Sequence, residues 1–150
     1  MNSTVLLTVL SGVLIYVLGQ LVEKLVIEPV HEMKKTIALI SQSFIEYDQF
    51  IHNPGLHETD KIDEVSRHFR KLSSQIRAHL YLVPLYRFMS RVFGLPERTK
   101  ALEAAKWLRG LSNGLHTNHG QPHGTNAKTK EKICDYLGIY MPDDERWPRE

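Results

Sequence analysis

The chain has 150 residues, a net charge of +2 at neutral pH and a single cysteine. This length is typical of one domain, and one cysteine excludes the class of small secreted proteins that are held together by internal disulfides. The near-neutral total conceals a division, because the first 22 residues carry no charged side chain and all 19 basic and 17 acidic residues follow them.

The uncharged N-terminal segment is long enough to cross a membrane. Residues 4–22 read TVLLTVLSGVLIYVLGQLV, and about 20 apolar residues span a hydrocarbon layer of ~30 Å as a helix. A cleaved signal peptide would need a basic start and a small-residue cleavage site, and neither is present. A buried helix of a soluble protein would normally show a polar stripe. We therefore expect a transmembrane anchor over residues 1–28.

Basic residues near the ends of the anchor predict its orientation. No lysine or arginine precedes the apolar run, whereas Lys24, Lys34 and Lys35 follow it. The positive-inside rule then places the N-terminus outside and the C-terminal domain in the cytosol. Gly12 and Gly19 share one face of the anchor and are candidate residues for transmembrane helix packing, although glycine is also common in membrane helices that make no such contact.

Two heptad series predict an antiparallel helical hairpin at the start of the cytosolic domain, which we expect to cover residues 29–140. Glu28-Pro29 is predicted to interrupt the helix at the membrane exit, and Pro29 can also start a new helix at its first position. His52-Asn53-Pro54-Gly55 is predicted to form the turn between the two helices. Apolar residues recur with steps of three and four on both sides of that turn, which is the period of a packed helix seam. The series comprise Val30, Met33, Ile37, Ile40, Phe44, Tyr47 and Ile51, and then Ile62, Val65, Phe69, Leu72, Ile76, His79 and Val83.

Shorter helices are predicted to complete an all-α fold. They cover residues 85–93, 97–112 and 125–137, separated by Gly and Pro signals. In the second of them, Leu102, Ala105, Leu108 and Leu111 are expected to face the core. The last ten residues, 141–150, form a polar tail that we expect to fray.

Basic residues with interleaved aromatic residues indicate a contact surface for an anionic partner. On a membrane-tethered protein that partner would be the anionic head groups of the cytoplasmic leaflet, or another protein. Nucleic acid is not expected, because no recognition motif is present. The alternative is a set of solvated helix faces. The candidate contact residues are Arg87, Arg91, Arg98, Lys100, Lys106 and Arg109.

Three histidines are candidate metal ligands, and Cys134 could supply a fourth. His116, His119 and His123 lie in a loop rich in Gly and Asn, and imidazoles are good zinc ligands. Their spacing matches no zinc pattern, so we favour a polar loop without metal and expect no cofactor. The nucleotide-binding, hydrolase and metalloprotease motifs are all missing. The lone Cys134 is more typical of a structural residue than of a catalytic thiol, and we predict that the chain is not an enzyme.

The stretch of residues 17–37 resembles the start of small uncharacterised bacterial single-pass membrane proteins. The matching positions are Gly19-Gln20 near the end of the anchor and Ile27-Glu28-Pro29 with Glu32 after it. The resemblance covers only this part of the chain and implies no activity. It implies a bacterial or prophage origin, and the anchor is then expected in the bacterial inner (plasma) membrane.

These observations lead to one expected function and two alternatives. We expect a membrane-anchored helical protein that binds or scaffolds at the cytosolic face of a bacterial plasma membrane. The first alternative is a membrane-active effector or exclusion factor that forms homo-oligomers through its transmembrane helix. The second is a metal-dependent enzyme that uses the histidine-rich loop.

Overall fold

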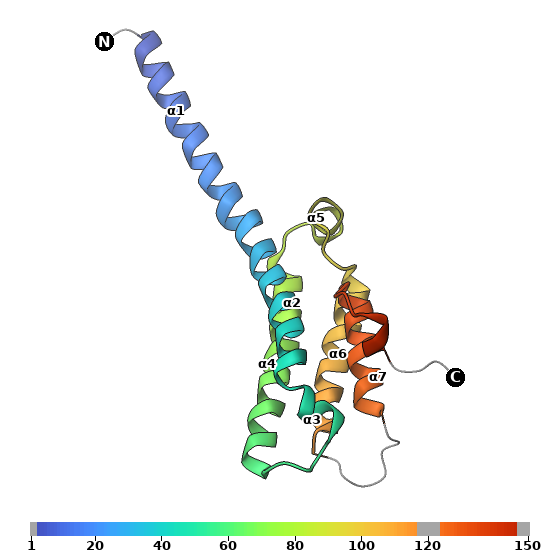
Figure 1. The fold of residues 1–150 in the computed structure, drawn as a ribbon. Helices are drawn as coiled ribbons and strands as arrows, with labels where there is room; N and C mark the ends of the chain where they lie inside the picture. The colour runs from blue at the N-terminus through green and yellow to red at the C-terminus, as the bar shows by residue number, and fades with distance from the viewer. Residues whose placement is uncertain (1–2, 117–123, 147–150) are drawn as a thin grey trace.

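The structure is a computed structural model that describes residues 3–116 and 124–146, apart from the side chain of Thr4. A long helix projects from one end of a helical bundle (Figure 1), and no strand occurs among the described residues. This confirms the all-α fold. In chain order the elements are α1 (Ser3–Val22), a π-helical turn η1 (Glu23–Ile27), α2 (Glu28–Glu46), α3 (Asp48–His52), α4 (Thr59–Leu82), α5 (Tyr86–Phe93), α6 (Arg98–Gly114), α7 (Thr125–Leu137) and a 3-10 turn η2 (Asp143–Glu145).

The predicted interruption of the helix at Glu28-Pro29 is wrong, because one helix continues from α1 through η1 into α2. Pro29 does lie in the first turn of α2, as predicted. Pro29 has no N–H to donate, and in a regular α-helix its ring would clash with the carbonyl of Leu25. In η1 the Glu28 N–H donates instead to the Glu23 carbonyl, five residues back. This wider turn accommodates the proline without ending the helix. The predicted domain boundary at residue 28 therefore lies inside a continuous helix.

The predicted hairpin is present, formed by α2 and α4 (Figure 1). The apolar positions of both heptad series face the core, and Met33, Ile40, Phe69 and Ile76 are fully buried. The first helix of the hairpin was expected to continue to Ile51, but α2 ends at Glu46. At Tyr47 the backbone leaves the helical region (φ −105°, ψ 23°) before the short α3 begins. This bend directs Ile51 into the core.

The helices α6 and α7 complete the bundle, with α6 packed against both α4 and α7. Small buried residues, Ala101, Ala104 and Ala105, allow α6 to approach α4 closely, and the Ser73 Oγ donates a 2.6 Å hydrogen bond across the interface to the Ala105 carbonyl. The prediction that Leu102 faces the core is wrong, since this side chain is exposed. The face of α6 that packs in the bundle is therefore formed by the small alanines and does not include Leu102.

The start of the C-terminal tail is packed on α7, contrary to the expectation that it frays. Met141 is buried, and one Arg146 Nη atom lies 3.1 Å from a Glu131 carboxylate oxygen and 3.4 Å from one of Asp135. The burial of Met141 and the ion pairs of Arg146 with α7 therefore hold residues 141–146 against the bundle.

Two histidines of α4 donate hydrogen bonds across the hairpin to hydroxyl groups of α2. The Thr36 Oγ1 donates its hydrogen to the Glu32 carbonyl, so it must accept from the His79 Nε2–H at 3.0 Å. Ser43 and His68 repeat this arrangement at 2.7 Å, with Ser43 donating to the Leu39 carbonyl. The His79 Nδ1 is buried without a partner among the described residues. Protonation there would create a buried, unpaired cation, which is costly.

Acidification is expected to destabilise the hairpin through His79. Burial lowers the pKa of His79, against an opposing effect of Glu32 that raises it. Below the unfolded pKa of about 6.5 the unfolded chain binds a proton that the folded chain resists, so the free energy of unfolding falls as the pH falls. Denaturation of the full chain in neutral micelles, followed by circular dichroism between neutral pH and the folded-state pKa, measures this loss.

His79→Gln is the matched variant for this measurement, because it keeps an N–H near Thr36 and removes the titration. Its free energy of unfolding should depend less on pH than that of the wild type. Parallel pH profiles of the two proteins would contradict a role for His79.

Candidate functional site

Helix α5 lies at the end of the bundle from which α1 projects (Figure 1). Exposed apolar side chains lie on α5 and beside it. Leu85, Phe88 and Val92 are 78%, 61% and 58% exposed, and Tyr81 and Leu82 at the end of α4 are exposed as well. Apolar side chains that are exposed together, rather than singly, indicate an interaction surface. We call these five residues, with Arg87, Arg91 and Arg98, the α5 surface.

A strained turn places Leu85 on this surface. Leu85 adopts φ 43° and ψ 45° and is the only non-glycine residue with positive φ among the described residues. Its carbonyl accepts hydrogen bonds from the N–H groups of Phe88 (2.8 Å) and Met89 (3.1 Å), and so starts α5. This conformation costs a leucine roughly 1–2 kcal/mol. Backbone strain of this kind is concentrated at functional sites.

The opposite side of α5 is fixed to the bundle by Tyr86. This side chain is buried, and its hydroxyl donates a 2.7 Å hydrogen bond to the Pro96 carbonyl. Burial raises the pKa of Tyr86 to about 12, against an opposing effect of Arg98 that lowers it. The hydroxyl therefore keeps its proton at physiological pH. Met89 and Phe93 also pack against the core, so the outward face of α5 has a defined direction.

The arginines of the α5 surface line one open groove of about 900 Å³ beside the apolar side chains. Arg98 comes from the first turn of α6, where its Nη1 lies 3.4 Å from the Leu80 carbonyl and its guanidinium lies 5.6 Å from the centre of the Tyr81 ring. Glu97 is the acidic residue of the groove. Within the described part of the chain, no carboxylate lies within 4.0 Å of the guanidinium nitrogens of Arg87, Arg91 or Arg98. Their charges thus remain available to a partner.

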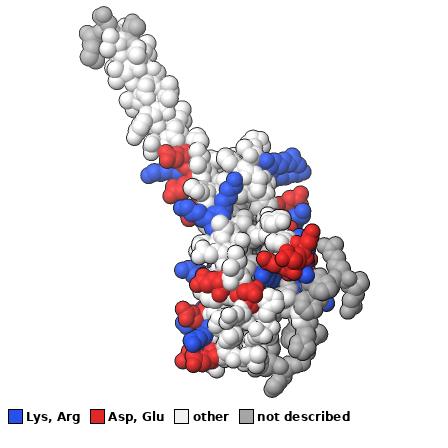
Figure 2. All heavy atoms as spheres, viewed as in Figure 1, with Lys and Arg blue, Asp and Glu red and all other residues white. Residues whose placement is uncertain are grey.

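The structure brings together only part of the predicted basic set. Lys100 is exposed in the first turn of α6, near the groove. Lys106 and Arg109 lie further along α6, and the Lys106 Nζ is 3.6 Å from a carboxylate oxygen of Glu103. Figure 2 shows basic groups on either side of an uncharged patch at the α1 end of the bundle. We therefore restrict the candidate site to the α5 surface.

The predicted packing face of α1 is uncovered within this chain. A Cβ atom added at Gly12 or Gly19 would meet no atom within 4 Å. Self-association through this face stays a prediction.

The histidine-rich loop lies mostly outside the described residues, which include neither His119 nor His123. The His116 Nε2 lies 3.6 Å from a carboxylate oxygen of Asp63. Among the residues that the structure describes, no three histidine, cysteine or acidic side chains converge as metal ligands. Metal binding by this loop, which we do not expect, therefore stays untested. Cys134 is buried in α7, and burial raises its pKa to about 11, so at neutral pH it is a thiol rather than a thiolate nucleophile.

Comparison of the chain with protein-family models, curated proteins and solved structures gives no match.

Replacing Leu85 by glycine is expected to stabilise the fold. Glycine adopts positive φ without strain, and the leucine side chain is largely exposed, so little burial is lost. The free energy of unfolding in neutral micelles should rise by about 1 kcal/mol. Leu56→Gly is the control, because Leu56 is equally exposed, at 76%, and has no positive φ. A Leu85→Gly protein no more stable than the wild type would contradict the strain.

Proposed function

We propose that the chain is a single-pass membrane protein whose α5 surface lies on the anionic cytosolic leaflet and holds the helical bundle there as a binding or scaffolding domain. One observation carries the proposal. Helix α5 lies at the same end of the bundle as the apolar helix α1 (Figure 1), and it carries exposed apolar side chains and arginines that have no carboxylate partner among the described residues.

The properties of α1 support its role as the anchor. Its 20 residues give a length of about 30 Å at 1.5 Å per residue, which matches the hydrocarbon layer. Its apolar side chains are exposed, with Leu7 at 64% and Ile15 at 70%, and the most apolar part of the helix has no residue buried against the bundle. Lipid would remove this surface from water.

The α5 surface has the composition of an interfacial helix. Phe88 and Val92 would enter the boundary between head groups and acyl chains, while Arg87 and Arg91 would remain among the phosphates. Each basic residue near an anionic leaflet contributes about 1 kcal/mol, so Arg87, Arg91 and Arg98 together would contribute on the order of 3 kcal/mol. That is enough to keep a tethered domain on the surface.

The continuous helix supports a fixed orientation. A flexible linker after the membrane would let the bundle turn freely, whereas η1 joins α1 directly to α2, and α2 is packed in the core through Val30 and Met33. The α5 surface is therefore held at a set position relative to the membrane.

The anchor and its orientation are tested by cysteine labelling in spheroplasts. Cys134 is buried, so Cys134→Ala provides the background, into which Ser3→Cys or Ile45→Cys introduces an exposed thiol. An impermeant maleimide should label position 3 in intact spheroplasts and position 45 only after lysis. Labelling of position 45 in intact spheroplasts would reverse the orientation. If mass spectrometry of the purified protein showed that the α1 residues had been removed, this would contradict the anchor.

Docking of α5 is tested by fluorescence in vesicles that contain the full chain. A polarity-sensitive fluorophore at Phe88→Cys should be quenched by lipid-attached quenchers in anionic vesicles, and less in zwitterionic vesicles. The control is Ile45→Cys, on a residue that is 77% exposed at the far end of α2. Equal quenching at the two positions would contradict docking.

Charge removal is expected to weaken docking selectively. Arg87→Gln with Arg91→Gln should weaken docking by about 2 kcal/mol, which lowers the ratio of docked to undocked protein roughly thirtyfold. Lys106→Gln with Arg109→Gln removes the same charge from outside the α5 surface and should change the ratio little. Equal losses in both double variants, measured by the same quenching, would show that only net charge matters.

A further inference from the structure

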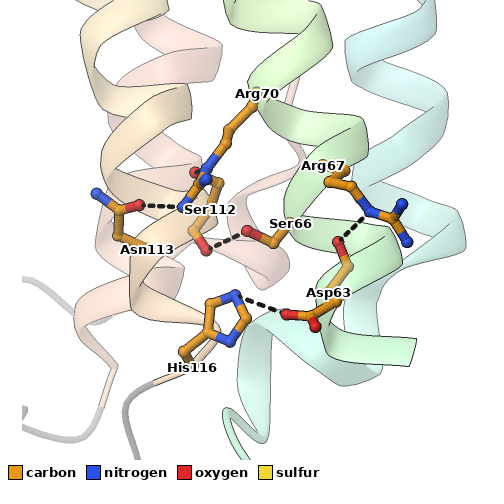
Figure 3. Close-up of polar contacts among 7 residues, drawn as sticks. All are labelled: Asp63, Ser66, Arg67, Arg70, Ser112, Asn113 and His116. Carbon is orange, nitrogen blue, oxygen red and sulfur yellow. Dashed lines mark hydrogen bonds and ion pairs between the residues drawn. The ribbon is translucent and has the colours of Figure 1, made fainter. Parts of the chain in front are cut away.

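Two pockets at opposite ends of the bundle are lined by arginines, and they differ in how these side chains are placed. In the pocket away from α1, the Arg70 Nη2 donates a 2.9 Å hydrogen bond to the Asn113 Oδ1, and the Arg67 side chain lies on the side of α4 away from Arg70 (Figure 3). The Asp63 carboxylate lines the same pocket, 3.6 Å from the His116 Nε2. The arginines of this pocket therefore do not converge on one ligand.

The groove beside α5, which we call the α5 groove, lies along one side of that helix. Its lining includes Arg87, Ser90 and Arg91. Because the last two follow the first by three and four positions, all three share one helix face. Arg98 and Thr99 also line the groove, from the first turn of α6. The groove is thus formed between the arginine side of α5 and the start of α6.

The lining of the α5 groove combines apolar and cationic side chains. Leu85 and Phe88 line it and are largely exposed. Glu97 supplies the one carboxylate of the lining, against three arginines, and it lies more than 4.0 Å from their guanidinium nitrogens. The groove therefore has an excess of positive charge next to uncovered apolar surface.

An amphiphile fits this lining better than a small anion does. The groove has a volume of about 900 Å³, which lies within the range of about 300–1,000 Å³ that is typical of small-molecule sites. A hydrated anion would contact the arginines and leave Leu85 and Phe88 in water, whereas a ligand with an apolar chain would cover both. An acidic head group on that chain would lie beside the guanidinium groups. One anionic lipid molecule has both parts.

We propose that the α5 groove binds one anionic phospholipid, with an acyl chain against Leu85 and Phe88 and the phosphate group beside the arginines. The lipid comes from the leaflet on which α5 lies, so this proposal rests on the proposed function. It differs from docking on a charged leaflet, because a groove selects single molecules and saturates at one lipid per chain.

Arg98 is the arginine best placed for this contact. Its guanidinium is already held by the Leu80 carbonyl, at 3.4 Å, and by the Tyr81 ring, at 5.6 Å from the ring centre. A side chain that is held in place before binding loses little conformational freedom when the ligand binds.

The site is tested by native mass spectrometry of the full chain in micelles of a non-ionic detergent, which contain no leaflet. Phosphatidylglycerol is titrated into the micelles, and phosphatidylcholine with the same acyl chains is the control lipid. The fraction of protein that carries one phosphatidylglycerol should saturate, and it should exceed the fraction that carries one phosphatidylcholine at equal concentration. Equal binding of the two lipids, or a series of adducts without saturation at one, would overturn the proposal.

Matched variants separate the groove from the rest of the protein. Thr99→Trp fills the groove and keeps every charge, so it should abolish the one-lipid adduct, whereas Ser74→Trp adds the same ring at an exposed position of α4 outside the groove and should not. Arg98→Gln should lower the adduct, and Arg109→Gln, which removes the same charge outside the groove, should not. Circular dichroism shows whether each variant keeps the fold. Retention of the adduct in both groove variants would assign the lipid to another surface and overturn the proposal.

Failure of this proposal is distinguishable from failure of the proposed function. Quenching at position 88 in anionic vesicles, together with no one-lipid adduct in micelles, would overturn lipid binding in the groove and leave the docking of α5. A saturable adduct in micelles without quenching in vesicles would support the groove and contradict docking.

Discussion

The architecture depends on a helix that continues past a proline. From Val5 to Glu46 the chain forms one helical rod, which has an exposed apolar half and a half that is packed in the bundle core. The π-helical turn Glu23–Ile27 makes this possible, because its wider hydrogen bonding accommodates Pro29 where a regular helix would break. If the apolar half lies in a membrane, as we propose, the rod transmits the position of the membrane to the whole bundle.

The two ends of the bundle differ in chemistry. At the α1 end, arginines stand beside exposed Phe88 and Val92, a combination that suits a surface both anionic and apolar. At the far end, Asp63, Ser66, Arg67, Arg70 and His116 line a polar pocket. Under the proposed function, the α1 end holds the protein to the leaflet. The His79–Thr36 bond lies between them, in the hairpin that joins both ends.

Most of the fold could be predicted from periodicity, and the exceptions have local causes. The heptads that contain Met33 and Phe69 located the hairpin, because burial of one helix face leaves a regular pattern. Leu102 was misplaced because α6 packs through alanines, and a pattern that ranks residues by hydrophobicity prefers the leucine. The Pro29 prediction failed because a π-helical turn has no sequence signature that we could identify. The bend at Tyr47 likewise follows from packing of α3 rather than from a turn motif.

The sites were harder to predict than the fold. Sequence identified Arg87, Arg91 and Arg98 as part of a basic segment, but it could not separate them from Lys106 and Arg109, since that requires the direction of α6. The positive φ of Leu85 depends on how the turn after Pro84 fits the bundle. Arg70 and Asn113 are 43 residues apart, and only the packing of α4 on α6 brings them together. A charge count cannot show which arginines lack a carboxylate partner.

The most direct test of the account is a scan of nitroxide labels along residues 15–37 of the full chain in anionic nanodiscs, in which accessibility to oxygen and to a water-soluble paramagnetic reagent is measured at each position. The account predicts helical periodicity through Pro29. It also predicts a change from lipid to water or bundle contact within Glu23–Ile27. Loss of periodicity at Glu28-Pro29 would show a flexible joint after the apolar helix, and access of the water-soluble reagent to residues 15–22 would show that this helix does not lie in the membrane.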